Sequence, residues 1–335
     1  MLNLCTLFDS NYLIRGLTLY NSLARHCAEF HLYIFAFDEK CYDLLKNLRL
    51  KYATVISLKE FEDEKLLSVK SIRTKAEYCW TCTPSTILYC LKKYQLESCA
   101  YLDADLLFFN SPQVLINELK DDSIILTLHR FPKNHDTSEI NGKYCVQFMA
   151  FKNNSQGLIT LNWWREECIK WCYNRLEDGK RGDQKYLDDW TERYQGVHVL
   201  KNLGGGVAPW NVVNYDFWKK NGEILGREIS TGQKFKLIFF HYHNSTIYKI
   251  LGRLKTKYFQ PVNKPTELIF YREYDKYLNQ AYKKIKSLDK KFNSGINKKI
   301  TNYIILAVND AIPLFVKNIY RYIKYGNKQL KNNNG

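Results

Sequence analysis

Residues 98–109 read SCAYLDADLLFF, and this stretch decides the fold. The apolar runs on both sides of Asp103 and Asp105 are typical of strands buried in a sheet. Two carboxylates between such runs are costly to desolvate unless something compensates their charge. A hard divalent cation such as Mn²⁺ or Mg²⁺ compensates well, and it keeps coordination positions open for phosphate oxygens. The stretch predicts a strand that ends on metal-binding carboxylates, with a solvated turn as the alternative interpretation.

Outward from this stretch, strands alternate with helices in both directions. The predicted strands are 2–8, 31–37, 53–58, 98–102, 124–128, 144–151 and 235–243. The predicted helices are one that follows the Asp9-Ser10 cap, then 38–50, 74–94 and 158–176, with Pro84 expected to kink or divide the third. This alternation predicts a mostly parallel, layered α/β sheet, a fold class that binds ligands at the carboxyl ends of its strands.

The positive charge of the chain is concentrated at one end. Of 335 residues, 50 are Lys or Arg and 34 are Asp or Glu, a net charge of +16. Residues 1–248 hold 31 basic and 29 acidic residues, whereas residues 249–335 hold 19 and 5. A nucleic-acid-binding protein is the alternative that such a charge suggests, but the excess lies outside the part that bears the motifs, and no nucleic-acid module is visible. We therefore expect no nucleic-acid partner.

Ten cysteines are scattered among mostly apolar neighbours, as buried free thiols are. No basic region followed by a long apolar stretch opens the chain, so the sequence predicts a reducing, cytoplasmic compartment. Cys79 and Cys82 have the spacing of a redox pair, but two packed thiols inside a helix are the favoured interpretation. A zinc site that adds Cys168 and Cys172 is disfavoured by their four-residue step.

The chain is expected to divide near residue 249. Residues 1–248 would form the α/β domain, and 249–335 a basic, mainly helical extension. Residues 300–324 have the pattern of an amphipathic helix with a basic polar face. Such a helix suits an anionic membrane surface, which predicts a peripheral protein on the inner face of the plasma membrane. The alternative is a helical cap packed on the domain.

Four segments, in order along the chain, carry a resemblance to a known family. They are Thr6-Leu7-Phe8-Asp9-Ser10-Asn11-Tyr12, Tyr101-Leu102-Asp103-Ala104-Asp105, Gly182-Asp183-Gln184 and Phe240-His241-Tyr242-His243. Together they resemble the GT-A fold glycosyltransferases, particularly glycosyltransferase family eight, which includes glycogenin and bacterial lipopolysaccharide galactosyltransferases. The resemblance spans residues 3 to about 250 and implies a GT-A catalytic domain.

The resemblance also implies roles for single residues. Tyr12 matches a tyrosine that stacks on the nucleotide base, beside Leu7, Phe8 and Asp9. Asp103 and Asp105, with His241 or His243, match the ligands of a Mn²⁺ or Mg²⁺ cofactor. The remaining implied contacts to the nucleotide sugar are Leu102, Trp210 and Asn211, the last two with a plain flexible loop as the alternative. The implied residues at the transferred sugar are Asp183 and Gln184, with a helix-capping Asp as the alternative. Apart from the resemblance, Arg73 precedes a long helix and is expected to add a bidentate contact to diphosphate or sugar, with a solvated surface charge as the alternative.

The chain departs from the family pattern at three places. Asn244 stands where the family has glycine, if His241 is the ligand, and Lys249 lacks the Pro-Trp that follows the family's lysine. Cys145-Val146-Gln147 replaces an Asn-Ser-Gly strand beside the sugar. The resemblance implies an enzyme that transfers a sugar, with retained configuration, from a nucleotide-diphosphate sugar to a hydroxyl of a glycan or lipid-linked acceptor, in surface-polysaccharide or glycoconjugate synthesis. A catalytically inactive scaffold of the same fold is the remaining alternative.

Overall fold

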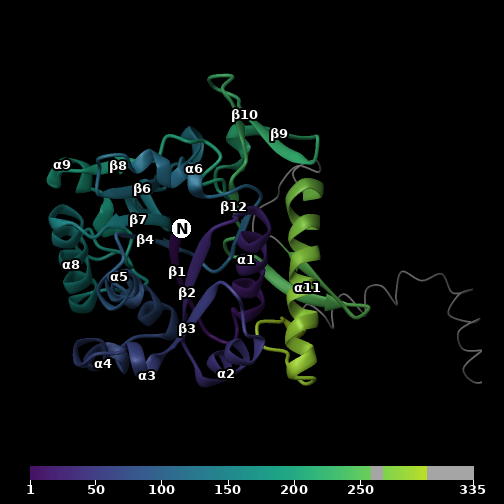
Figure 1. Cartoon of the computed structure of the whole chain (residues 1–335). Coiled ribbons are helices and arrows are strands. Elements are labelled where there is room, and N and C mark those ends of the chain that lie inside the picture. Colours follow the sequence, from purple (N-terminus) through teal and green to yellow (C-terminus); the bar gives the residue numbers. More distant parts are fainter. Residues whose placement is uncertain (258–266, 300–335) are drawn as a thin grey trace, which may run out of the picture.

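The computed structural model describes residues 1–257 and 267–299, and its centre is one seven-stranded sheet (Figure 1). The strand order is β3-β2-β1-β4-β7-β6-β8. Their bounds are β1 (Leu2–Phe8), β2 (Phe30–Ala36), β3 (Ala53–Ser57), β4 (Ser98–Leu102), β6 (Ile124–Leu128), β7 (Tyr144–Lys152) and β8 (Val197–Val199). Only β7 runs antiparallel to its two neighbours, so the prediction of a mostly parallel α/β sheet is confirmed.

The direction of winding reverses beside β1. The chain passes from β1 to β2 and β3 on one side, and then returns to place β4 on the other side of β1. Such a reversal opens a crevice at the carboxyl ends of the two strands, where open α/β sheets bind ligands. Asp103 directly follows β4, so the fold brings the predicted carboxylates to this crevice.

Helices cover both faces of the sheet, each over its own apolar core. On one face lie α1 (Leu13–His26), α2 (Glu39–Leu48) and α11 (Arg272–Leu288) (Figure 1). On the other lie α3 (Leu58–Phe61), α4 (Glu64–Lys70), α5 (Lys75–Lys93) and α8 (Ser155–Lys170). Shorter helices are α6 (Gln113–Ile116), α7 (Ser138–Asn141), α9 (Trp190–Arg193), η1 (Asn117–Leu119), η2 (Lys133–His135), η3 (Lys185–Leu187), η4 (Val212–Asn214) and η5 (Glu267–Tyr271).

Helix α5 is one unbroken element, so Pro84 does not divide it. Its first turn is fixed by a capping box, in which the Thr74 hydroxyl accepts from the Glu77 amide while the Glu77 carboxylate accepts from the Thr74 amide. Proline removes one donor from the helix interior. Around it, the hydroxyls of Thr81 and Thr83 donate to carbonyls of the preceding turn.

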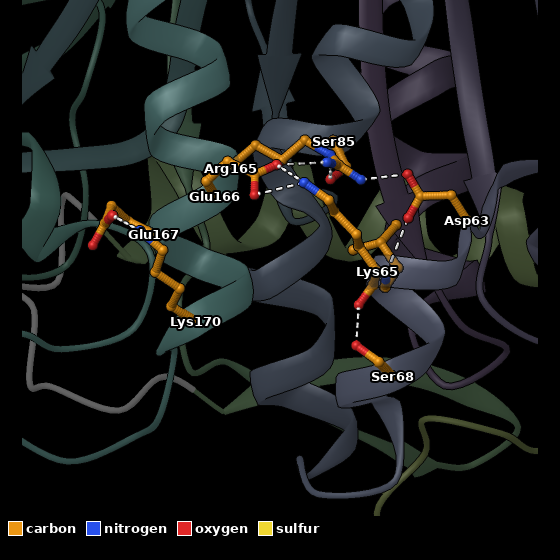
Figure 2. Close-up of polar contacts among 9 residues, drawn as sticks. Asp63, Lys65, Ser68, Ser85, Arg165, Glu166, Glu167 and Lys170 are labelled. Carbon is orange, nitrogen blue, oxygen red and sulfur yellow. Dashed lines mark hydrogen bonds and ion pairs between the residues drawn. The ribbon is translucent and has the colours of Figure 1, made fainter.

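A buried arginine fastens α8 to α5 and α4 (Figure 2). The Arg165 Nε atom donates to Ser85 Oγ at 3.0 Å, and its other nitrogens bond to Asp63 and Glu166. Lys65 reaches the same Glu166 carboxylate at 2.8 Å. Because Arg165 is only 8% exposed, all three of its partners are needed to offset its desolvation.

The strand predicted at 235–243 is two strands that belong to different sheets. β11 (Lys234–Lys236) joins β9 (Tyr215–Lys220) and β10 (Glu223–Glu228), whereas β12 (Phe239–His241) pairs with β5 (Leu106–Phe108). His241 lies directly opposite Leu106 in that second pair. The antiparallel pairing of β12 therefore carries His241 to the turn that holds Asp105.

The chain beyond residue 249 departs from the expected helical appendage. β13 (Thr246–Ile250) and β14 (Arg253–Lys257) form an antiparallel hairpin where helix was expected. Helix α11 packs against α1 and shares its apolar core, and the Tyr274 ring stacks on Tyr242 at 3.6 Å. The described part of this segment thus belongs to the body of the α/β domain, because its aromatic face is buried there.

The amphipathic helix expected at 300–324 lies outside the described residues. Within residues 1–257 and 267–299, no helix has the length and apolar character needed to span a membrane.

Candidate active site

Two carboxylates and one imidazole converge at the carboxyl end of β4. Asp103 and Asp105 occupy the turn between β4 and β5, and His241 ends β12. The His241 Nε2 atom lies 3.0 Å from Asp105 Oδ1 and 3.7 Å from Asp103 Oδ2. The Asp103 amide donates to the Gln147 carbonyl at 3.0 Å, and the Tyr242 amide donates to the Asp105 carbonyl at 3.0 Å. The backbone of the turn is therefore fixed from two neighbouring strands.

The three groups perturb one another strongly. Burial raises the pKa of Asp103 to about 6, an effect that the positive charge of His241 opposes. Burial also acts to raise the pKa of Asp105, but the charge and hydrogen bond of His241 outweigh it and bring this pKa to about 2. Although burial alone would lower the pKa of His241, the Asp105 carboxylate raises it well above its ordinary value. An imidazolium thus offsets one of the two carboxylate charges, chiefly that of Asp105.

This donor set fits a hard divalent cation. One ligand atom from each of Asp103, Asp105 and His241 lies within 4.8 Å of the others. Two carboxylates and a neutral imidazole match the preference of Mn²⁺, and carboxylate-rich sites also hold Mg²⁺. In the structure the cationic partner of these carboxylates is the protonated ring of His241, 3.0 Å from Asp105. Metal binding would replace that proton.

Beside this cluster lies a cavity of about 580 Å³ that is lined by aromatic, polar and charged side chains. Among its lining residues are Trp80, Asp103, His129, Phe131, Cys145, Arg181, Asp183, Gln184, Trp210, His241 and His243. Three of the predicted metal-site residues, Asp103, His241 and His243, therefore share one cavity with the predicted sugar-site residues Asp183 and Gln184, and Asp105 lies behind His241. The size of this cavity suits a small organic ligand.

Asp183 and Gln184 lie at the start of the 3₁₀ turn η3 and face the cavity. Gly182 precedes them at φ +54°, a left-handed conformation that glycine adopts readily, and the Trp80 ring lies against it. Burial, reinforced by the nearby Asp103 charge, raises the pKa of Asp183 to about 7. The Gln184 amide donates to the Asn141 carbonyl at 2.7 Å, which fixes its carboxamide at the cavity wall.

The two histidines of the FHYH segment are not equivalent. β12 ends at His241, and the His243 ring lies 5.4 Å from the His241 ring, in the turn that follows. Burial and the His241 charge lower the pKa of His243 to about 4. His241 contacts the carboxylates, whereas His243 lines the cavity as a neutral ring.

The residues predicted to surround the nucleotide fall into two groups. Tyr12 is 42% exposed at the start of α1, and the nearby Asp105 charge together with burial raises its pKa to about 12. Leu7, Phe8 and Leu102 have side chains buried in the cores on the two faces of the sheet. Asp9 accepts hydrogen bonds from the amides of Asn11 and Tyr12 and so fixes the loop before α1. Only Tyr12 among these offers a large exposed side chain beside the carboxylates.

Two predicted contact residues have their polar groups engaged elsewhere. Arg73 donates to the carbonyls of Cys172 and Ile169 at 2.6 and 2.7 Å, so its guanidinium caps the end of α8 and does not line the cavity. Asn211 is fully buried, and its amide donates to the carbonyls of His129 and Gly206. The neighbouring Trp210 does line the cavity, and its indole N–H donates to the His129 carbonyl at 2.8 Å.

Sequence reasoning missed several residues around the site. Arg15, buried on α1, holds its guanidinium 4.6 Å from the centre of the Tyr12 ring, and its charge helps to lower the pKa of Asp105. His129, stacked on Phe131 at 4.6 Å, belongs to the cavity wall. The i, i+3 spacing of Tyr12 and Arg15 could have indicated Arg15 from the sequence. No local sequence pattern indicated His129.

The cysteines are free thiols, as predicted. Cys79 is partly exposed, and the other nine are buried. Cys5, Cys90 and Cys99 gather within 4.8 Å of one another between β1, α5 and β4, a cluster that their sequence spacing did not suggest.

The fold and this site define an α/β protein with a candidate divalent-metal site at the switch point of its sheet. No protein-family model matches the chain. It is 32% identical over 246 residues to the uncharacterized protein YfnD of Bacillus subtilis (strain 168), an alignment that covers 72% of this chain and 77% of YfnD. The chain belongs to the same protein family as YfnD. The uncharacterized protein YfnF of the same organism is 29% identical over 303 residues, covering 88% of this chain and 97% of YfnF.

Two solved structures to which the chain is similar are of glycosyltransferases. A crystal structure of the galactosyltransferase LgtC, in complex with donor and acceptor sugar analogs, has a TM-score of 0.49 at 12% identity and covers 83% of this chain and 96% of LgtC. Mouse xyloside xylosyltransferase 1 has a TM-score of 0.42 at 13% identity and covers 62% of this chain and 87% of that structure.

Proposed function

We propose that the protein is a metal-dependent GT-A glycosyltransferase that moves a sugar from a nucleotide-diphosphate sugar to a hydroxyl. One observation carries the proposal: Asp103, Asp105 and His241 converge at the switch point of the sheet, and Asp103 and His241 line a cavity that Asp183 and Gln184 also line. A cation site beside a cavity with hydrogen-bonding groups suits a diphosphate joined to a sugar. The sequence resemblance to glycosyltransferase family eight supports the same assignment.

Each side chain then has a physical task. Asp103, Asp105 and His241 hold Mn²⁺ or Mg²⁺, which, when bound, neutralises the negative charge that builds on a departing diphosphate. Tyr12 offers an aromatic face for the nucleotide base beside the carboxylates. Arg15 adds a fixed positive charge on the same side of the site.

Asp183 and Gln184 act at the sugar. A carboxylate at this place stabilises positive charge on the sugar carbon as its bond to the diphosphate breaks, and the Gln184 carboxamide orients sugar hydroxyls. Trp210, Trp80 and Phe131 give the cavity apolar ring faces, against which the C–H face of a sugar packs. The retained configuration expected from the family resemblance belongs to this proposal.

The setting of the reaction is part of the proposal as well. A glycan or lipid-linked acceptor of bacterial surface-polysaccharide or glycoconjugate synthesis fits the family resemblance. The ten free thiols support a reducing, cytoplasmic compartment. The basic residues beyond 249, which include the segment 300–324, support attachment to an anionic membrane surface.

Donor binding tests the proposal. Thermal unfolding is followed with a panel of nucleotide-diphosphate sugars, with and without Mn²⁺. A donor at a hundred times its dissociation constant adds about 2.7 kcal/mol of stability, which raises the unfolding temperature measurably. We expect at least one sugar nucleotide to stabilise the protein only when Mn²⁺ is present, and Asp103→Ala and Asp105→Ala to abolish the effect. A Mn²⁺-dependent shift that survives in both variants would contradict the proposal, whereas the exposed Asp121→Asn serves as the control that retains it.

A further inference from the structure

Gln147 contacts both halves of the candidate metal site. Its backbone carbonyl accepts from the Asp103 amide at 3.0 Å, and its side-chain Oε1 lies 2.8 Å from His241 Nδ1. The residue is fully buried, so neither interaction competes with bulk water. One residue of β7 therefore fixes a carboxylate turn and an imidazole that come from two other strands.

An irregularity in the sheet puts Gln147 in this position. The register of β6 against β7 shifts, so that Ile125 pairs with Ala150 but Thr127 pairs with Cys145. Residues 146–149 consequently lie opposite Leu126 alone. Bulges of this kind redirect side chains and are common next to active sites. Here the bulge lies beside the end of β12, where His241 is found.

The chemistry of the contact selects one form of the imidazole ring. A carboxamide oxygen only accepts hydrogen bonds, so Nδ1 of His241 must carry the hydrogen that Gln147 Oε1 receives. When a divalent cation displaces the Nε2 proton that Asp105 Oδ1 otherwise accepts at 3.0 Å, the neutral ring has its lone pair on Nε2. Ligand histidines are commonly oriented through their second nitrogen in this way.

The contact also has a cost that packing alone does not explain. The Nε2 atom of Gln147 is buried without a hydrogen-bond partner among the described residues. A buried, unsatisfied amide group lowers stability, and an apolar side chain of the same length would avoid this loss. The residue is therefore better suited to orienting His241 than to stabilising the core.

We propose that Gln147 is a positioning residue that holds His241 as the Nδ1–H tautomer and directs Nε2 toward a divalent cation shared with Asp103 and Asp105. This inference rests on the metal site of the proposed function. It assigns a role to one of the residues at which the chain departs from the family pattern.

The test measures Mn²⁺ affinity of the full chain by titration calorimetry, without any donor. Gln147→Met keeps the length of the side chain and removes the acceptor, and we expect affinity to fall about tenfold to a hundredfold, as for other groups that orient metal ligands. Gln147→Glu keeps an oxygen against Nδ1 and should recover at least part of the loss. Thr127→Val is the matched control, because it removes a buried 2.7 Å hydrogen bond in the same bulge without touching His241.

A second readout reports the ring directly. Nitrogen-15 NMR of the protein saturated with Mg²⁺, which is diamagnetic, should show a hydrogen-bonded Nδ1–H in the wild type and an Nδ1–H without this hydrogen bond in Gln147→Met. Unchanged Mn²⁺ affinity in Gln147→Met, or an equal loss in Thr127→Val, would overturn the positioning role. Asp103→Ala and Asp105→Ala distinguish the two proposals: if they lose Mn²⁺ while Gln147→Met does not, only the positioning role fails. If they bind Mn²⁺ as the wild type does, the metal site itself fails.

Discussion

The buried carboxylate of Asp183 should lower the free energy of unfolding of the protein, and the Asp183→Asn variant should measure the size of this effect. The side chain is 6% exposed, and burial together with the Asp103 charge raises its pKa from 3.8 to about 7. Between these values the folded protein holds a proton that the unfolded chain has already released. Stability is therefore lost as the pH rises through this range, by about 1.4 kcal/mol per pH unit.

The asparagine side chain of the Asp183→Asn variant would have almost the same shape but no charge at any pH. We expect the free energy of unfolding of this variant to exceed that of the wild type by an amount that grows by about 2 kcal/mol between pH 5 and pH 7 and levels off above pH 7. Urea unfolding followed by tryptophan fluorescence, in the presence of a chelator, measures this difference. The chelator is needed because a bound cation would itself change the charge around Asp183.

The control is Asp121→Asn, which changes an exposed carboxylate in the same chain. Its difference from the wild type should stay constant over the same pH range. If Asp183→Asn also shows a constant difference, then Asp183 titrates as an ordinary carboxylate. In that case the reasoning from burial is wrong. If the expected result is found, the gain in stability should accompany a loss of sugar transfer, since active sites commonly hold charged groups with perturbed pKa values that lower stability.

Three further predictions concern packing and thiols. Arg73→Met should lower the free energy of unfolding by about 2–3 kcal/mol, because it removes two charged hydrogen bonds from the end of α8. It should leave the Mn²⁺ affinity measured by calorimetry unchanged. A selective loss of donor affinity would instead mean that Arg73 contacts the donor. Tyr274→Ala should cost about 3–5 kcal/mol in urea unfolding, because the ring stacks on Tyr242 inside the main core; a negligible cost would mean that α11 is dispensable. With a thiol reagent at neutral pH, the native protein should react at Cys79 alone and slowly, because burial raises its pKa to about 12, and mass spectrometry should find all ten cysteines modified only after unfolding.

The sequence was sufficient for six of the seven strands of the central sheet, all but the short β8, and for the residues that carry motifs. Short, nearly continuous apolar runs indicated the positions of β1, β2, β3, β4, β6 and β7, because strands of a parallel sheet are buried on both faces. Asp103 and Asp105 could be identified because paired carboxylates beside apolar runs are unusual. Asp183 came from the family resemblance, which also implied a histidine ligand without deciding between His241 and His243.

Contacts between distant segments could not be predicted in the same way. Gln147 is visible in the sequence as a departure from a family pattern, but its contact with His241 depends on a bulge in β7. Arg73 has the positive charge expected of a residue that binds phosphate. Only the folded structure shows that both terminal nitrogens of its guanidinium donate to carbonyls at the end of α8. The hairpin β13–β14 was missed because its lysines face solvent and conceal the short alternation of a strand.

The central claim is that this site uses a divalent metal to transfer sugar from a nucleotide-diphosphate donor. The most direct measurement is the release of nucleoside diphosphate from a panel of such donors, followed by mass spectrometry with Mn²⁺ and with a chelator. We predict that at least one donor is cleaved, that the chelator stops the release, and that Asp103→Ala, Asp105→Ala and Asp183→Asn each reduce it strongly. Release that continues at the same rate with the chelator and in the Asp103→Ala and Asp105→Ala variants would contradict the claim.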